Sequence, residues 1–409
     1  MEKSRPFKIP ACLVLLVFAA ASLCQAKLSP LAPRPDWSRL DPYQGTMTRE
    51  TFLSLLENVY APGGAWKDFV DVSDDGAIIR TAPGRPPYQL RFAADGAPPA
   101  PIPSTWRSRS ALQPPPPGKP LAGLRIAIDP GHIGGSWAKV EERWFRIGNS
   151  APVTEGDMTL KVAKLLVPRL TAMGAQVYLT RSKPAPVTNA RPGQLRAAAV
   201  ESLRDKGEAV NSHSVTKESE RLFYRASEIR HRARLVNESI RPDLVLCLHF
   251  NAEDWGNEKN ARLVAANHLH FLVTGSWGRK ELEYEDQRLE LFVKLLSRSF
   301  GEELRVTDAI SRSMASATGL PPYRYEGSSA VRVNSNPYIW ARNLLANRLF
   351  ACPVVYVEPY VMNNASVFAR IQAGDYEGRR RFGKSLLPSI YREYADAIAA
   401  GLASYYSHR

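Results

Sequence analysis

Residues 124–132 read LRIAIDPGH, an apolar run that ends in a polar turn carrying a histidine, His132. Two further apolar runs end in a similar way. The run 244–248 leads directly to His249, and the run 354–357 leads to Glu358. Runs of this length are typical of buried strands in a parallel sheet, and open α/β sheets bind their ligands at the carboxyl ends of such strands. The sequence therefore predicts two histidines and a carboxylate at one sheet edge, which are the parts of a catalytic zinc site.

Strand-like and helix-like segments alternate from Leu121 onward. A helix is expected after Asp157, which can cap it, and another carries an apolar stripe that includes Phe292. Segments 183–217 and 301–337 fit the alternation poorly. The pattern predicts an α/β fold with a mostly parallel central sheet and helices on both faces. The expected strands are Leu124–Asp129, Gln176–Thr180, Leu244–Phe250, Leu269–Val273 and Pro353–Glu358.

The first 26 residues have the organisation of a secretory signal peptide. Lys3, Arg5 and Lys8 precede an apolar stretch, Leu13–Leu23, and small residues favour cleavage after Ala26. We therefore expect the protein to be exported, to a periplasm or to the cell exterior. Lipidation at residue 24 and an uncleaved anchor stay open as alternatives.

Three further parts follow the signal peptide. Residues 27–93 are expected to form an N-terminal extension or small module, with a helix that buries Phe52 and a hairpin around Ser73–Gly76. Residues 94–120 contain nine prolines and are expected to form a stiff linker. Residues 121–409 are the expected catalytic domain.

The chain is strongly basic, with a formal net charge of +14. Such a surface suits an anionic partner such as nucleic acid, acidic lipid or an acidic cell-wall polymer. We expect no nucleic-acid partner, because no basic stretch is interleaved with aromatic residues. Cys247 and Cys352 both fall in predicted strands and are expected to be buried free thiols.

The expected zinc site needs three protein ligands and an open position for water. Zinc lowers the pKa of its bound water from about 15.7 to about 7, and a second carboxylate can carry the proton to a leaving amine. His132 and His249 supply two ligands at strand ends. Glu155 precedes the expected helix cap and can reach the same crevice. Glu358 then remains for proton transfer.

Five fragments of the sequence, in order, resemble the zinc-dependent N-acetylmuramoyl-L-alanine amidase family. Members of this family cut peptidoglycan between the lactyl group of muramic acid and the first L-alanine of the stem peptide. The resemblance covers about residues 121–409. The fragments are Asp129-Pro130-Gly131-His132-x-Gly134-Gly135, Glu155-x-x-Met158-x-Leu160, Val177–Arg181, Arg232-x-x-x-Val236-Asn237 with Leu244–Ala252, and Pro353–Glu358 with Asn363-Asn364.

The resemblance implies that His132, Glu155 and His249 bind Zn²⁺ and that Glu358 is the general acid/base. It also implies peptidoglycan as substrate and allows for an activating protein partner. Asp129 is expected to orient His132.

Several alternatives stay open. The segment between His132 and Glu155 is longer than usual in the family, so that Glu141 or Glu142 could be the third ligand. Region 253–350 is also long, and its acidic stretch Glu281–Glu290 could cover the site as an autoinhibitory lid. Other functions with the same residues are a zinc peptidase or deacylase, and a non-catalytic wall-binding scaffold.

Overall fold

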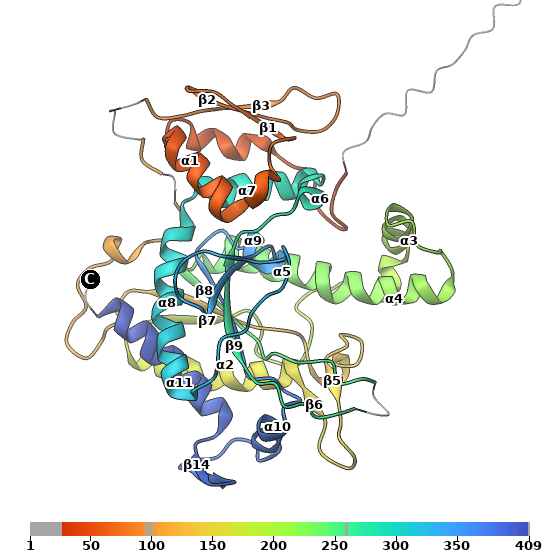
Figure 1. Ribbon diagram of the computed structural model, residues 1–409, viewed down its shortest axis with the longest axis vertical. Helices are drawn as coiled ribbons and strands as arrows, with labels where there is room; N and C mark the ends of the chain where they lie inside the picture. Colours follow the sequence, from red (N-terminus) through yellow and green to blue (C-terminus); the bar gives the residue numbers. More distant parts are fainter. Residues whose placement is uncertain (1–26, 95, 97–99, 103, 258–260, 408–409) are drawn as a thin grey trace, which may run out of the picture.

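The computed structural model describes residues 27–94, 96, 100–102, 104–257 and 261–407 of the 409-residue chain (Figure 1). The expected signal peptide, residues 1–26, lies outside these residues. Within the described ranges, no helix has the length and apolar character needed to span a bilayer.

A seven-stranded sheet forms the centre of the molecule. Its strands lie in the order β10 (Val331–Arg332), β11 (Ile339–Arg342), β9 (Leu269–Thr274), β12 (Val354–Pro359), β8 (Leu244–Leu248), β4 (Arg125–Pro130) and β7 (Gln176–Leu179). Strands β7, β4, β8 and β12 are parallel, whereas β9 pairs with β12 in the antiparallel direction. Each strand expected from the sequence forms, with ends that differ by one or two residues.

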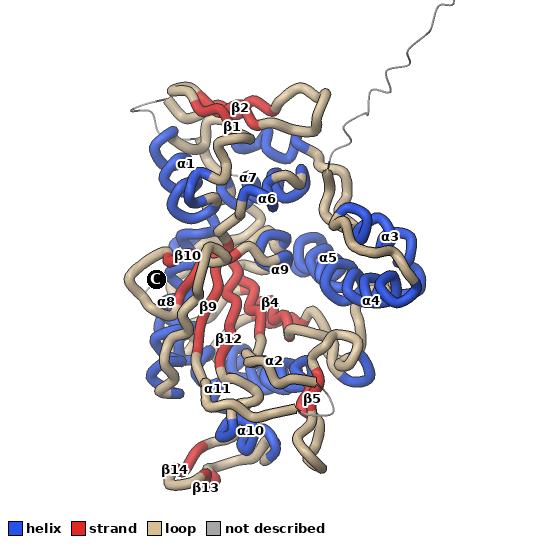
Figure 2. The backbone as a smooth tube through the Cα atoms, turned by 45° about the vertical axis from the view of Figure 1, so that its right-hand side comes forward, coloured by secondary structure: helices blue, strands red, loops and turns tan. Residues whose placement is uncertain are grey.

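Helices cover both faces of this sheet (Figure 2). One face packs against α2 (Glu155–Ala172), α8 (Ser299–Thr318) and α11 (Ile390–Tyr406). The other face packs against α5 (Glu228–Arg234) and α9 (Leu345–Leu349). Successive strand residues point to opposite faces, which explains why the strands are apolar without interruption. The expected fold class is confirmed. Cys247 and Cys352 are buried and free, as expected.

The N-terminal residues share a hydrophobic core with a later part of the chain. Phe52 stacks on Phe292, with ring centroids 6.1 Å apart and planes 3° apart. Tyr60 donates a hydrogen bond to the carbonyl of Lys294 at 3.2 Å. The elements involved lie together in Figure 1 and are α1 (Arg49–Leu55), β1 (Val70–Val72), β2 (Gly76–Ile79), β3 (Tyr88–Arg91), α6 (Arg279–Leu282) and α7 (Glu285–Leu296).

The segments that fitted the alternation poorly contain structure that the sequence pattern did not predict. Segment 183–217 includes most of a helical hairpin, α3 (Arg196–Asp205) and α4 (Ser212–Leu222), which packs around its own small apolar cluster. Segment 301–337 contains most of α8 and the edge strand β10. Other short elements are β5 (Trp144–Phe145), β6 (Val153–Thr154), α10 (Ala365–Gln372), β13 (Arg380–Phe382) and β14 (Ser385–Leu387).

Candidate metal centre

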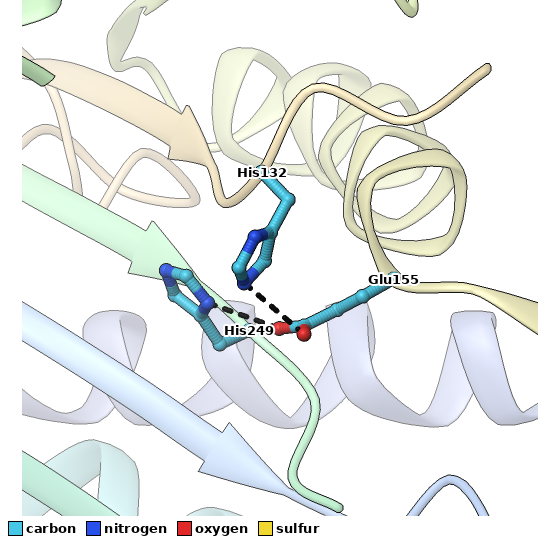
Figure 3. Close-up of side chains that lie close together, drawn as sticks. All are labelled: His132, Glu155 and His249. Atoms are coloured by element: carbon cyan, nitrogen blue, oxygen red, sulfur yellow. Dashed lines mark hydrogen bonds and ion pairs between the residues drawn. The ribbon is translucent and has the colours of Figure 1, made fainter. Parts of the chain in front are cut away.

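His132, Glu155 and His249 converge at the carboxyl edge of the parallel strands (Figure 3). Glu155 lies between the two imidazoles: its Oε2 is 3.1 Å from His132 Nε2, and its Oε1 is 3.0 Å from His249 Nδ1. One ligand atom from each residue lies within 4.8 Å of the others. Among the described residues, this is the group of three His, Cys, Asp or Glu side chains that could hold a metal ion.

Each of the three side chains comes from the end of a regular element. His132 follows β4 and has a φ of 60°, a left-handed conformation that turns its side chain toward the crevice. His249 follows β8, and Glu155 is the first residue of α2. The expectation that Asp157 caps α2 is wrong, because strand β6 leads straight into the helix and the N-cap is Thr154. Asp157 instead accepts a hydrogen bond from Thr154 Oγ1 at 2.6 Å.

Two glycines allow these elements to approach closely. A Cβ on Gly131 would lie 2.2 Å from the His249 ring, and a Cβ on Gly156 would lie 2.3 Å from the backbone nitrogen of Gly134. The turn after β4 therefore packs directly on His249 and on the start of α2. Only glycine leaves room for these contacts.

Glu155 is buried and surrounded by donors. Besides the two imidazoles, the backbone N–H of Phe250 donates to it at 3.1 Å, and Arg143 Nε lies 3.2 Å from Oε2. Burial by itself would raise the pKa of Glu155, but the charge of His132 and the hydrogen bonds from both imidazoles hold the pKa well below its ordinary value. The carboxylate is thus kept ionised, as a metal ligand must be.

Arg143 is a site residue that the sequence pattern did not indicate. Strands β5 and β6 are antiparallel, and Trp144 pairs with Thr154. One residue further along, Arg143 lies opposite Glu155, and the N–H of Glu155 donates to the carbonyl of Arg143 at 3.4 Å. The pairing of β5 with β6 therefore places the Arg143 guanidinium beside the Glu155 carboxylate. Two-residue strands are too short to give a periodic signal in the sequence.

Glu141 and Glu142, the alternative third ligands, lie outside the group of three described residues that could hold a metal ion. Glu141 accepts hydrogen bonds from the N–H groups of Ile133 and Gly134 at 2.8 and 3.0 Å, and its Oε1 is 3.6 Å from His132 Nδ1. Glu142 accepts from the hydroxyl of Tyr224 at 3.3 Å. Glu141 is therefore placed to orient the His132 ring.

The expectation that Asp129 orients His132 is wrong. Its carboxylate instead accepts from Thr180 Oγ1 at 2.5 Å and from Arg232 Nη1 at 3.1 Å. Arg232 also donates to the carbonyl of His132, at 2.8 Å, and Arg181 donates to the carbonyl of Gly131 at 3.0 Å. Both arginines are buried. They satisfy the carbonyls of the turn after β4 and so hold its shape.

Glu358 lies at the end of β12, beside the end of β8. It lines a cavity of about 950 Å³ together with His132, Glu155 and His249. Removal from bulk water, and then the negative charge of Glu155, raise the pKa of Glu358 well above its ordinary value. A carboxyl group with a raised pKa holds its proton more readily than an ordinary one, which suits a group that carries protons.

The acidic stretch Glu281–Glu290 lies elsewhere. Trp37 Nε1 donates to Glu285 at 2.8 Å, and Arg230 lies 3.5 Å from Asp286. Glu290 pairs with Arg348. No residue of this stretch is among the described residues that line the cavity. Its acidic groups stabilise the packing of α7 and do not reach the histidines.

Several solved structures are similar to this chain. The structure of an N-acetylmuramyl-L-alanine amidase from Mycobacterium abscessus is 19% identical, with a TM-score of 0.40 over 70% of this chain and 99% of that one. An amidase from Clostridioides difficile, solved in complex with a lipoprotein, is 12% identical, with a TM-score of 0.40 over 70% and 100%.

One from Nostoc punctiforme is 14% identical, with a TM-score of 0.36 over 70% and 98%. No curated protein matches the chain. Among models of protein families, that of the N-acetylmuramoyl-L-alanine amidases matches residues 126–386, the part that supplies every residue of the site described above. This chain belongs to the N-acetylmuramoyl-L-alanine amidase family.

Proposed function

We propose that this amidase holds Zn²⁺ with His132, Glu155 and His249 and uses Glu358 as its general acid/base. The observation that carries the proposal is the position of Glu155, 3.0–3.1 Å from one nitrogen of each imidazole. The bond cleaved by the family is the amide between N-acetylmuramic acid and L-alanine in peptidoglycan.

The donor set fits zinc. Two imidazole nitrogens and a carboxylate are a ligand set that catalytic zinc sites use, with one position left for water or substrate. Zinc bound there would supply a Lewis acid for the scissile carbonyl and would make water acidic enough to act as a nucleophile. Arg143 and Glu141 support this role, because they hold Glu155 and His132 in position.

The chain's own residues would then move one proton. Glu358 would accept a proton from water as the water oxygen forms a bond to the lactyl carbonyl carbon. The same carboxyl would give that proton to the nitrogen of L-alanine as the C–N bond breaks. The raised pKa of Glu358 supports this, because it makes the carboxylate a stronger base toward water than an ordinary carboxylate.

We also propose that the enzyme works outside the cytoplasm, in a periplasm or at the cell exterior. The basic, apolar and small-residue regions of residues 1–26 support export. Peptidoglycan, the substrate of the family, lies on that side of the membrane.

The test is digestion of purified sacculi followed by mass spectrometry of the products. Intact stem peptides with a free L-alanine amine are expected, and a zinc chelator should abolish their release. Fragments cut inside the stem would instead show a zinc peptidase. Absence of any product from zinc-loaded, folded protein would support a wall-binding scaffold and contradict the proposal.

A further inference from the structure

The cavity extends beyond the metal ligands, across the face of the sheet toward β11. The residues that line this extension are Leu272, Arg342, Leu344, Leu345, Ala346 and Tyr356. Among the described residues, this wall consists of apolar side chains and one guanidinium, that of Arg342. Such a surface suits a ligand that is short, partly apolar and anionic at one point.

Arg342 differs from the other arginines that line the cavity. Arg143 and Arg232 form ion pairs with buried carboxylates, and Arg225 is exposed to solvent, which screens its charge. Arg342 is half-buried, and in the described part of the chain it forms no ion pair. A guanidinium withdrawn from water is stabilised when an anion pairs with it.

An aromatic scaffold holds Arg342 in position. Its Nη1 donates to the hydroxyl of Tyr325 at 3.3 Å, and its guanidinium carbon lies 5.4 Å from the Tyr325 ring centre. Because arginine can only donate, the Tyr325 hydroxyl accepts from it and is free to donate to His270 Nε2 at 2.9 Å. The Tyr325 ring also packs edge-on against Trp340. The guanidinium is therefore oriented before any ligand arrives.

This scaffold stands next to the catalytic carboxylate. His270 on β9 is the direct cross-strand partner of Glu358 on β12. Arg342 and Glu358 also line the same cavity. A group bound by Arg342 would therefore belong to the same substrate molecule that reacts at Glu358.

We propose that Arg342 binds a carboxylate of the stem peptide and so selects stems that carry this carboxylate free rather than as a carboxamide. The planar guanidinium matches a carboxylate with two parallel hydrogen bonds. In peptidoglycan, the carboxylates belong to the stem peptide, because the N-acetylated sugar rings are uncharged. This inference rests on the proposed function, since it needs the stem peptide to enter the cavity.

The test uses four synthetic N-acetylmuramoyl tripeptides. They carry a free carboxylate or a carboxamide on the second stem residue, combined with a free or amidated C-terminus. We expect kcat/KM of the zinc-loaded wild type to fall about ten- to a hundredfold when the recognised carboxylate becomes a carboxamide. The two positions are varied separately, so the result identifies which carboxylate is bound.

Arg342→Gln should abolish this discrimination, chiefly by raising KM for the carboxylate substrate, while Arg342→Lys should keep part of it. Arg332→Gln is the matched control, because Arg332 also lies over an aromatic ring, that of Trp340, but does not line the cavity. Its discrimination should equal that of the wild type. Thermal melting shows whether each variant is folded.

The outcomes separate this inference from the proposed function. A wild type that cleaves all four substrates equally, or a preference that survives in folded Arg342→Gln, overturns the role of Arg342 and leaves the amidase mechanism intact. A wild type that cleaves none of them contradicts the proposed function, and the inference with it.

Discussion

At the scale of single residues, the site depends on the pairing of Arg143 with Glu155. Glu155 brings a buried negative charge into contact with two imidazoles, and Arg143 holds its second oxygen at 3.2 Å. Such outer partners fix the orientation of a ligand and raise metal affinity. The resemblance to the family indicated Glu155 as a candidate ligand, but nothing in the local pattern of the sequence indicated its partner, Arg143.

Arg143→Gln should weaken zinc binding about 10- to 100-fold, because the carboxylate loses the partner that orients it. The measurement is competition for zinc with a chelating dye. Arg146→Gln is the control, because Arg146 belongs to the same loop but is exposed. Equal zinc affinity in the wild type and Arg143→Gln would contradict the role given to Arg143.

Glu358→Gln should lower the release of stem peptides about 10²- to 10⁴-fold, since the amide cannot carry a proton. Zinc content should stay at the wild-type level, because Glu358 is not one of the three grouped ligands. Elemental analysis of the purified variant checks this. Loss of zinc would mean that Glu358 is a ligand and that the assigned roles are wrong.

His270 should make the fold sensitive to acid. Burial first, and then the charges of His268 and Arg342, lower its pKa from 6.5 to about 3. As the pH falls below 6.5, the unfolded chain binds a proton on this histidine while the folded chain does not, so stability is lost between pH 6.5 and pH 3. By pH 4.5, two units below 6.5, the loss from this group is roughly 3 kcal/mol, at about 1.36 kcal/mol per pH unit.

The experiment compares urea unfolding at pH 7 and pH 4.5 for the wild type and His270→Gln. The variant should lose less stability over this interval than the wild type does. His213→Gln, at an exposed histidine, should behave like the wild type. An equal loss in the wild type and His270→Gln would show that His270 does not cause the acid sensitivity.

At the scale of elements, the site depends on how closely the turn after β4 packs on the start of α2. Gly156→Ala places a Cβ 2.3 Å from the backbone nitrogen of Gly134, so that the turn or the helix must shift. We expect lower thermal stability and weaker zinc binding, since His132 and Glu155 lie on the two displaced segments. Gly193→Ala, where a Cβ meets nothing within 4 Å, is the control. Unchanged zinc affinity in Gly156→Ala would show that this contact is not needed.

The sequence predicted the long elements better than the short ones. Strands β4, β8 and β12 are continuous apolar runs, and the positions just at or after their carboxyl ends predicted His132, His249 and Glu358 as site residues. Strands β5 and β6 have two residues each, and β11 runs antiparallel to β4, β8 and β12. For these reasons the sequence did not predict that Arg143 or Arg342 lies at the site. Both arginines reach the site through pairings between strands, which periodicity along the chain does not encode.

At the scale of the whole molecule, the N-terminal residues and α7 depend on one another. The sequence predicted a helix around Phe52 and an apolar stripe containing Phe292, but not that the two rings stack. A contact between residues this far apart in the chain leaves no local signal. Residues 27–93 were expected to form an N-terminal extension or small module, and this division of the chain stays a prediction.

Phe52→Ala tests this dependence. Phe52 is fully buried, so its truncation should lower the free energy of unfolding by about 3–5 kcal/mol. Because the shared core reaches β9 through Val273, we expect zinc release and loss of helical circular dichroism to occur in one transition at a lower temperature. Ile78→Ala, at an exposed position, should change little. Zinc release at the wild-type temperature would show that the N-terminal residues form an independent unit.

The shared core also has a consequence for how the chain folds as it is made. Phe52 meets its partner on α7 only after more than 200 further residues have been synthesised, which takes roughly 10 to 50 seconds at the usual rate of translation. During this interval the apolar side chains of residues 40–92 lack the packing partners that α7 supplies. Nascent chains of this protein should therefore rely on a chaperone that shields their first hundred residues until α7 has emerged.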